Sequence, residues 1–286
     1  PSLSPRYWAP EGWTFGVIRQ DDGLEVRYGV SAPAAVSRGH VILLPPYGEP
    51  IEAFYETARD LNARNLTVWA LEPAGQSGSG RRGAERGVGH VKRFEPDAET
   101  LRRLVLEVIR PTRSETVVVA GEGAGALVAL LPEARTPYVD ALVLTAPDLD
   151  PKPTPQAEFW ASVGFGGGRA DGARGWKRPD GLLDGREGLV DAWRVANPDL
   201  RMGGPSHGWA LARAAAARRV AAEAAGESRP VVLLAPGEDA RATALCDALP
   251  RCTRSPWAAA PRPVHRAPET GRNAWLQQIE AQFGRL

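Results

Sequence analysis

Short apolar segments alternate with segments of helical periodicity along most of this chain. An alternation of this kind is typical of a mostly parallel β-sheet with helices packed on both faces. The length of 286 residues suits one large domain of this type. The predicted strands are Thr14–Ile18, Leu24–Val30, His40–Leu44, Leu66–Leu71, Thr116–Ala120, Ala141–Thr145, Val231–Ala235 and, with less apolar character, Cys252–Ser255. We therefore expect an α/β fold.

Both ends of the chain add detail to this expectation. The first two predicted strands are joined through Asp21-Asp22-Gly23, a sequence that favours a hairpin turn. The sheet is thus expected to begin with an antiparallel pair. Near the other end, Trp275, Ile279 and Phe283 recur at every fourth residue and predict a helix that docks on the core.

Residues 151–227 interrupt the alternation. The segment opens with Pro151-Lys152-Pro153-Thr154-Pro155, continues through the glycine-rich stretch Gly164–Gly175 and contains an alanine-rich helical stretch, Ala210–Ala225. We expect residues 151–227 to form a mostly helical cap over the carboxyl ends of the strands, where folds of this class bind their ligands. Residues 1–150 and 228–286 are then the core.

The segment Val117–Leu127 runs from a predicted strand into a predicted helix with almost no loop between them. The turn is Gly121-Glu122-Gly123-Ala124-Gly125, and small residues on either side of its centre permit the tight, strained geometry of a nucleophile elbow. A hydrolase would carry serine at the centre, but this chain carries Gly123. The alternative interpretation is a plain strand-to-helix turn.

Three further segments make the chain resemble the monoacylglycerol lipase and lysophospholipase group of α/β-hydrolases, from about Trp13 to Phe283. Gly75–Arg81 is similar to the group's glycine-rich block after the fourth strand, and Gly89-His90-Val91 is similar to the Gly-His-Val that follows it. The cap signature of the lysophospholipase branch resembles Ala196–Leu200 followed by Gly203–Trp209. The resemblance implies an α/β-hydrolase fold with a helical cap and carboxylic-ester hydrolysis.

The resemblance also implies partners for the missing serine. It assigns the catalytic acid to Asp239, in Gly237-Glu238-Asp239, and the catalytic histidine to His265, in Pro263–Arg266. The order elbow, acid, histidine is the order of α/β-hydrolases. The alternative interpretations are a helix N-cap for Asp239 and an ordinary exposed loop histidine for His265.

An oxyanion hole requires backbone N–H groups that point at the developing negative charge. The resemblance implies one donor at Ala124 and another in the loop after the third strand, where the group has His-Gly. Here that loop contains Pro45 and Pro46, which have no N–H, so Tyr47 is the predicted donor.

Differences from the group gather at the predicted active centre. Beside Gly123, the chain has Glu122 in place of histidine, and Glu72-Pro73-Ala74 in place of Asp-x-Arg. Ser77 and Ser79 lie on another loop and are predicted to be turn residues, not nucleophiles. An elbow shifted by one residue onto Glu122 conflicts with the alternation of side chains along a strand.

These observations lead to three functional hypotheses. The favoured one is a non-catalytic pseudo-hydrolase that binds a lipid, an acyl compound or another small apolar ligand, or a protein partner. The second is an enzyme that uses Asp239 and His265 as a general base without a covalent intermediate. The third is a carboxylic-ester hydrolase captured as a Ser-to-Gly variant at Gly123. The sequence leaves open whether the protein is an enzyme.

Composition also bears on the partners, cofactors and location of the protein. The formal net charge of +1 gives no reason to expect a nucleic-acid partner. The two cysteines, Cys246 and Cys252, are expected to be free thiols, with a local bridge in an oxidising compartment as the alternative. Neither has the spacing of a metal site, and we expect no metal or cofactor.

No apolar run reaches the length of a membrane span and no signal peptide is visible, so we predict a cytoplasmic protein.

Overall fold

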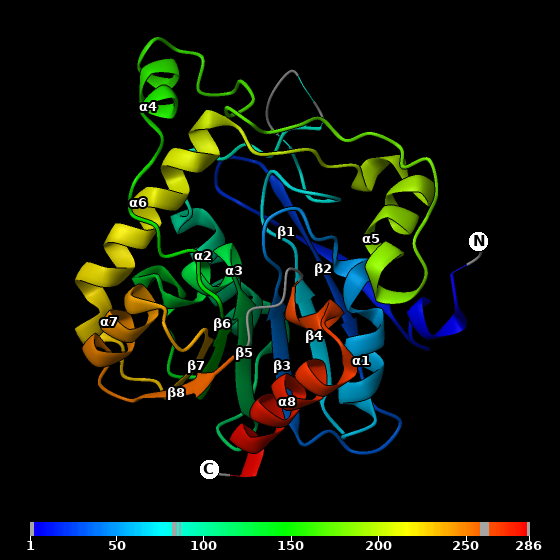
Figure 1. Ribbon diagram of the computed structural model, residues 1–286. Helices are drawn as coiled ribbons and strands as arrows, with labels where there is room; N and C mark the ends of the chain where they lie inside the picture. Colours follow the sequence, from blue (N-terminus) through cyan, green and yellow to red (C-terminus); the bar gives the residue numbers. More distant parts are fainter. Residues whose placement is uncertain (1–2, 82–84, 86, 258–262, 285–286) are drawn as a thin grey trace.

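The computed structural model describes residues 3–81, 85, 87–257 and 263–284. Eight strands form one sheet in the order β1-β2-β4-β3-β5-β6-β7-β8 (Figure 1). The strands are β1 (Thr14–Arg19), β2 (Glu25–Ser31), β3 (Gly39–Leu44), β4 (Thr67–Leu71), β5 (Thr116–Glu122), β6 (Ala141–Thr145), β7 (Val231–Ala235) and β8 (Cys252–Pro256). β2 is antiparallel to both β1 and β4, and the other neighbours are parallel. The predicted fold class and its antiparallel start are confirmed.

Helices cover both faces of this sheet. Figure 1 shows α1 (Tyr55–Asn62) and α8 (Glu269–Glu280) on one face, where Trp275 and Ile279 of the predicted C-terminal helix are buried. The other face packs against α2 (Glu95–Arg103), α3 (Ala124–Leu130) and α7 (Ala240–Ala248). Shorter helical turns are Pro5–Tyr7, Ile51–Phe54, Leu104–Ile109, Pro132–Ala134, Pro198–Leu200, Ala224–Gly226, Val264–Arg266 and Ala281–Gly284.

The central strand β5 decides which way the residues before the elbow point. Val117 and Val119 pack in the core on the α3 side, whereas Val118 and Ala120 pack in the core on the α8 side. Because side chains alternate along a strand, the side chain of Glu122 continues the α8 side. The residue that precedes the elbow therefore points at the C-terminal part of the chain.

Three helices connect β6 to β7: α4 (Pro155–Ser162), α5 (Gly185–Ala196) and α6 (His207–Glu223). Residues 151–227 are called the cap below. α6 packs along α3, and the segment between α5 and α6 contacts the loops that follow β3 and β4 (Figure 1). The cap therefore lies over the carboxyl ends of these strands. At its tip, α4 and the residues after it expose Phe159, Trp160 and Phe165.

Cys246 at the end of α7 and Cys252 at the start of β8 form a disulfide. The expectation of two free thiols is therefore wrong. The turn between α7 and β8 brings the two Cα atoms to 5.3 Å, within the range that a disulfide spans. Disulfides are typical of oxidising compartments, so this bond gives the predicted cytoplasmic location no support. Among the described residues, no helix combines the length and the apolarity that crossing a bilayer requires.

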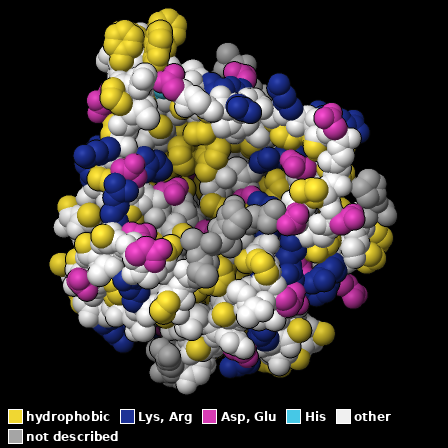
Figure 2. Space-filling model, viewed as in Figure 1, with side chains coloured by type: hydrophobic (Ala, Val, Ile, Leu, Met, Phe, Trp, Pro, Cys, Tyr) yellow, Lys and Arg dark blue, Asp and Glu magenta, His cyan; other side chains and the backbone are white. Residues whose placement is uncertain are grey.

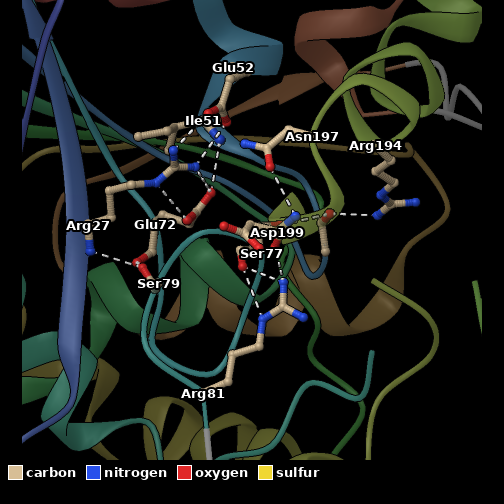
Figure 3. Close-up of polar contacts among 11 residues, drawn as sticks. Arg27, Ile51, Glu52, Glu72, Ser77, Ser79, Arg81, Arg194, Asn197 and Asp199 are labelled. Carbon is tan, nitrogen blue, oxygen red and sulfur yellow. Dashed lines mark hydrogen bonds and ion pairs between the residues drawn. The ribbon is translucent and has the colours of Figure 1, made fainter. Parts of the chain in front are cut away.

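A buried ion-pair cluster connects the antiparallel hairpin to the loops of the active centre (Figure 3). The Arg27 guanidinium on β2 donates to both carboxylate oxygens of Glu52, at 2.7 and 2.9 Å, and to both of Glu72, at 2.9 and 3.1 Å. Glu72 is fully buried, and its Oε1 also accepts from the N–H of Ile51 at 3.1 Å. Glu72 thus has a structural role: it positions the loop after β3.

Replacement of Arg27 by methionine is expected to lower the free energy of unfolding by about 3 kcal/mol, because two buried carboxyl groups lose their partner. Urea denaturation measures this difference. The matched control is Arg19→Met in the same hairpin, since the pair of Arg19 with Glu25 is exposed and should contribute less than about 1 kcal/mol. Equal effects of the two substitutions would contradict this account of the cluster.

Candidate active site

The turn after β5 has the backbone geometry of a nucleophile elbow. Gly123 adopts φ 54° and ψ −116° between the end of β5 and the first residue of α3. Its N–H donates to the carbonyl of Thr145 at the end of β6, at 3.1 Å. Side chains other than hydrogen are strained at this φ, which is why elbows that carry serine need small neighbours. The turn thus has the shape of an elbow, with glycine at its centre.

The two flanking glycines are required by close packing. A Cβ on Gly125 would lie 2.5 Å from the carbonyl oxygen of Leu44 and 2.7 Å from that of Pro45. A Cβ on Gly121 would lie 2.9 Å from the carbonyl oxygen of Gly125. These distances are far inside van der Waals contact and involve backbone atoms that cannot turn away. The loop after β3 is therefore packed directly against the elbow.

Pro46 and Asp148 border the space beside Gly123. A Cβ at this position would lie 3.1 Å from Cβ of Pro46 and 3.7 Å from Oδ2 of Asp148. The N–H of Asp148 donates to the carbonyl of Gly123 at 3.3 Å. The Asp148 carboxylate makes no hydrogen bond with any described residue, and burial raises its pKa. The sequence analysis missed Asp148, although its position just after the strand next to β5 was a usable signal.

His265 is buried between two glutamates. Its ring packs on Phe54, with ring centroids 4.2 Å apart, and its side chain is 0% exposed. Nε2 lies 3.2 Å from Oε2 of Glu49, and Nδ1 lies 3.7 Å from Oε2 of Glu122. Both carboxylate oxygens of Glu122 also accept from the N–H of Val264, at 2.9 and 3.0 Å. The interpretation of His265 as an exposed loop residue is therefore wrong.

The predicted pair of Asp239 and His265 is not formed. Asp239 is the N-cap of α7, and its Oδ1 accepts from the N–H groups of Arg241 and Ala242, both at 3.0 Å. Within the described part of the chain, no hydrogen bond or ion pair joins Asp239 to His265. The physical reason is competition: the exposed N–H groups of a helix hold Asp239, and two nearer carboxylates hold His265.

The charges in this cluster favour a protonated histidine. Burial alone would raise the pKa of Glu49, but hydrogen bonding to His265 and the charge of Arg266 lower it to about 2. Burial would lower the pKa of His265, but the neighbouring carboxylates of Glu122 and Glu49 raise it. Burial raises the pKa of Glu122 in spite of the neighbouring His265. An imidazole that is charged and sealed from solvent is a poor general base.

The two predicted oxyanion donors remain available. The N–H of Tyr47 has no hydrogen-bond partner among the described residues, and Ala124 is the first residue of α3, where no intrahelical acceptor exists. The Tyr47 hydroxyl accepts from the N–H of Gly89 at 3.1 Å and donates to the carbonyl of Gly203 at 3.2 Å. Its ring contacts Trp209 of the cap, with centroids 4.6 Å apart. The assignment of Tyr47 and Ala124 to an oxyanion hole stays a prediction.

Arginines fasten the cap to the loops around the elbow (Figure 3). The Arg81 side chain donates to the carbonyl of Ser77 on its own loop and to the carbonyls of Asp199 and Arg201 in the cap. Arg194 of α5 donates to the carbonyl of Gly48 at 2.8 Å. The cap segment that resembles the lysophospholipase signature is thus bound to the loop after β4.

The two serines on that loop are structural. The Ser79 hydroxyl donates to the carbonyl of Glu72 at 2.7 Å and accepts from the N–H of Arg27 at 2.9 Å. Ser77 is 1% exposed and its hydroxyl faces the carbonyl of Gly48 at 3.4 Å. Neither serine has a histidine within hydrogen-bond reach among the described residues. Across the same residues, no group of His, Cys, Asp and Glu side chains is arranged to hold a metal ion.

The histidine cluster makes a prediction for NMR titration. The pKa of His265 is raised by its two glutamates, whereas burial lowers the pKa values of His40 and His90. As pH rises, the imidazoles of His40 and His90 should therefore lose their proton before that of His265. Their titration midpoints should lie below about pH 6.5, and the midpoint of His265 above about pH 6.5. His265 titrating first would show that the contacts with Glu49 and Glu122 do not exist in solution.

The sequence of this chain matches a known protein family. Residues 35–243 match the family described as serine aminopeptidase, S33 (Hydrolase_4). Lysophospholipase L2 of Escherichia coli K12 is 26% identical over 214 residues, which are 70% of this chain and 63% of the relative. The chain thus spans less than two thirds of that relative's length.

Solved structures show the same fold. A thermostable carboxyl esterase of Bacillus coagulans superposes with a TM-score of 0.69 at 15% identity, covering 96% of this chain and 99% of the esterase. The monoacylglycerol lipase of Paleococcus ferrophilus gives 0.63 at 18% identity, covering 89% of this chain and 98% of the lipase. The chain belongs to the Hydrolase_4 family and has the α/β-hydrolase fold.

Proposed function

We propose that this protein is a non-catalytic member of its family, which binds a small acyl or other apolar ligand beneath the cap. The observation that carries the proposal is Gly123, placed in an intact elbow without a side chain. Without a serine Oγ no acyl-enzyme can form at this position. The turn has the shape of an elbow, but glycine at its centre cannot form an acyl-enzyme.

The other members of a triad support the same proposal. Asp239 is committed to the N-terminus of α7 and His265 to Glu49 and Glu122. A general base must reach the proton that it removes, and the His265 ring is sealed from solvent. A hydrolysis that relies on these two residues without a nucleophile is therefore not supported.

The space beneath the cap suits a ligand with an uncharged polar end. Figure 2 shows a hollow on this face of the molecule with hydrophobic side chains gathered in its upper part. The N–H groups of Tyr47 and Ala124 can donate to a carbonyl oxygen, as an oxyanion hole would. Asp148, beside Gly123, would repel a carboxylate whenever it is ionised. An uncharged acyl ester, such as a monoacylglycerol, therefore fits this space better than a fatty-acid anion.

Two assays test this proposal together. The purified protein should not hydrolyse monoacylglycerol, lysophospholipid or p-nitrophenyl esters above background, and a fluorophosphonate probe should label no serine. It should nevertheless retain monoacylglycerol in native mass spectrometry, and more of it than of the matching fatty acid. Labelling at a defined serine would refute the non-catalytic assignment. An absence of any retained acyl compound would refute the ligand.

Gly123→Ser separates this proposal from the alternative of a hydrolase captured as a glycine variant. We expect no recovery of esterase activity, because the new side chain meets Pro46 and Asp148 and has no free histidine. The matched control is Gly167→Ser, since a Cβ at Gly167 meets no atom within 4 Å. Robust esterase activity in Gly123→Ser alone, with stoichiometric fluorophosphonate labelling, would favour the captured hydrolase.

A further inference from the structure

A second cavity lies away from the elbow. It has a volume of about 490 Å³ and is enclosed by the β1–β2 hairpin, the loop after β4 and the first turns of α2. Neither Gly123 nor the predicted oxyanion donors, Tyr47 and Ala124, line it. This volume is within the range of small-molecule sites. The cavity is therefore independent of the acyl-binding site proposed beside Gly123.

Two buried polar side chains form the floor of this cavity. Gln20 is 6% exposed and Asp97 is 5% exposed, and both line the cavity. Oδ1 of Asp97 accepts from Nε2 of Gln20 at 2.9 Å and from the N–H of Ala74 at 3.0 Å. Nε2 of Gln20 also donates to Oγ1 of Thr100 at 3.0 Å, while the Thr100 hydroxyl donates to the carbonyl of Pro96 at 2.7 Å.

With Asp97 ionised, this network leaves only acceptors on the floor. Both amide protons of Gln20 are donated to protein acceptors, so only its Oε1 can still form a hydrogen bond. Both hydrogen bonds from described residues to the Asp97 carboxylate go to Oδ1, so its Oδ2 can still accept. Among the contacts of the described residues, neither oxygen accepts a hydrogen bond, and both residues line the cavity. A ligand that satisfies this floor must bring hydrogen-bond donors.

The walls and the rim add shape and charge. Leu24, Ala74, Val91 and Pro96 give the cavity apolar walls. The charged and titratable groups that line it are Asp21, Asp22, His90, Lys92, Arg93, Asp97, Glu99 and Arg103. Arg103 is bound to Glu107 and to the carbonyl of Arg19. With Asp97 ionised and His90 neutral, four acids and three bases leave a net charge of −1.

We propose that this cavity binds a small organic ammonium: a primary amine with an apolar body. The ammonium group donates to Oδ2 of Asp97 and Oε1 of Gln20, which are the two acceptors without a partner. The apolar body lies against Leu24, Val91 and Pro96. A primary ammonium has three donors and no acceptor, so it matches a floor that offers acceptors alone.

The protonation of Asp97 gives the site a characteristic pH dependence. Burial, helped by the nearby charge of Asp22, raises the pKa of Asp97 to about 7, although the hydrogen bonds from Ala74 and Gln20 oppose this shift. Below about pH 7 the carboxyl group is therefore mostly neutral in the empty protein, and binding an ammonium must first release its proton. Affinity should consequently rise as pH increases through about 7, while the alkylammonium stays protonated.

Calorimetric titration with three probes of similar size tests the proposal. Phenethylamine carries the ammonium, 2-phenylethanol replaces it with a hydroxyl, and 3-phenylpropionate replaces it with a carboxylate. At about pH 8 phenethylamine should bind at least about tenfold more tightly than the alcohol, and the carboxylate should not bind measurably. Equal affinity for the amine and the alcohol would overturn the proposal.

Asp97→Asn removes the charge and keeps an acceptor for Gln20 and Ala74. It should weaken phenethylamine at least about tenfold and abolish the rise in affinity with pH. Asp247→Asn, on an exposed face of α7, is the matched control and should bind like the unmodified protein. If Asp97→Asn does not fold, the affinity of the unmodified protein for phenethylamine, measured over a range of pH, tests the role of Asp97. Affinity that is unchanged between about pH 5.5 and about pH 8.5 refutes the assignment of Asp97.

Discussion

The contact between the elbow and the loop after β3 is the constraint on which the active centre depends. Gly125 has no Cβ, so the start of α3 comes within van der Waals distance of the carbonyls of Leu44 and Pro45. This close approach places the loop after β3 directly against the elbow, with Pro46 beside Gly123. The steric requirement belongs to the turn and not to the reaction, because it holds whether or not position 123 carries a nucleophile.

The replacements around this turn have a shared physical consequence. With Glu122 before the elbow and Glu49 in the loop after β3, two carboxylates flank His265, which the resemblance predicts to be the base. Arg266 then binds Glu49 with Nε at 3.0 Å and Nη2 at 2.7 Å and compensates part of the buried negative charge. His265 thereby becomes part of a packed ionic cluster.

The glycine-rich block after β4 has a similar structural role. It is held to β2 through Arg27 and Glu72, and to the cap through Arg81 and the carbonyl of Asp199 (Figure 3). In this chain the block therefore serves to attach the cap to the core.

The sequence by itself determined the strands, their parallel arrangement, the hairpin and the elbow, because periodicity and turn chemistry are local properties. Only the tertiary structure decided which acid meets His265, since Glu49 lies 216 positions away along the chain. The same holds for Asp148 beside Gly123 and for the acceptors that Asp97 turns toward a cavity. The N-cap role of Asp239 is local and was one of the two interpretations that the sequence offered. A residue's type shows which bonds it can form, but a partner far along the chain depends on how distant segments pack.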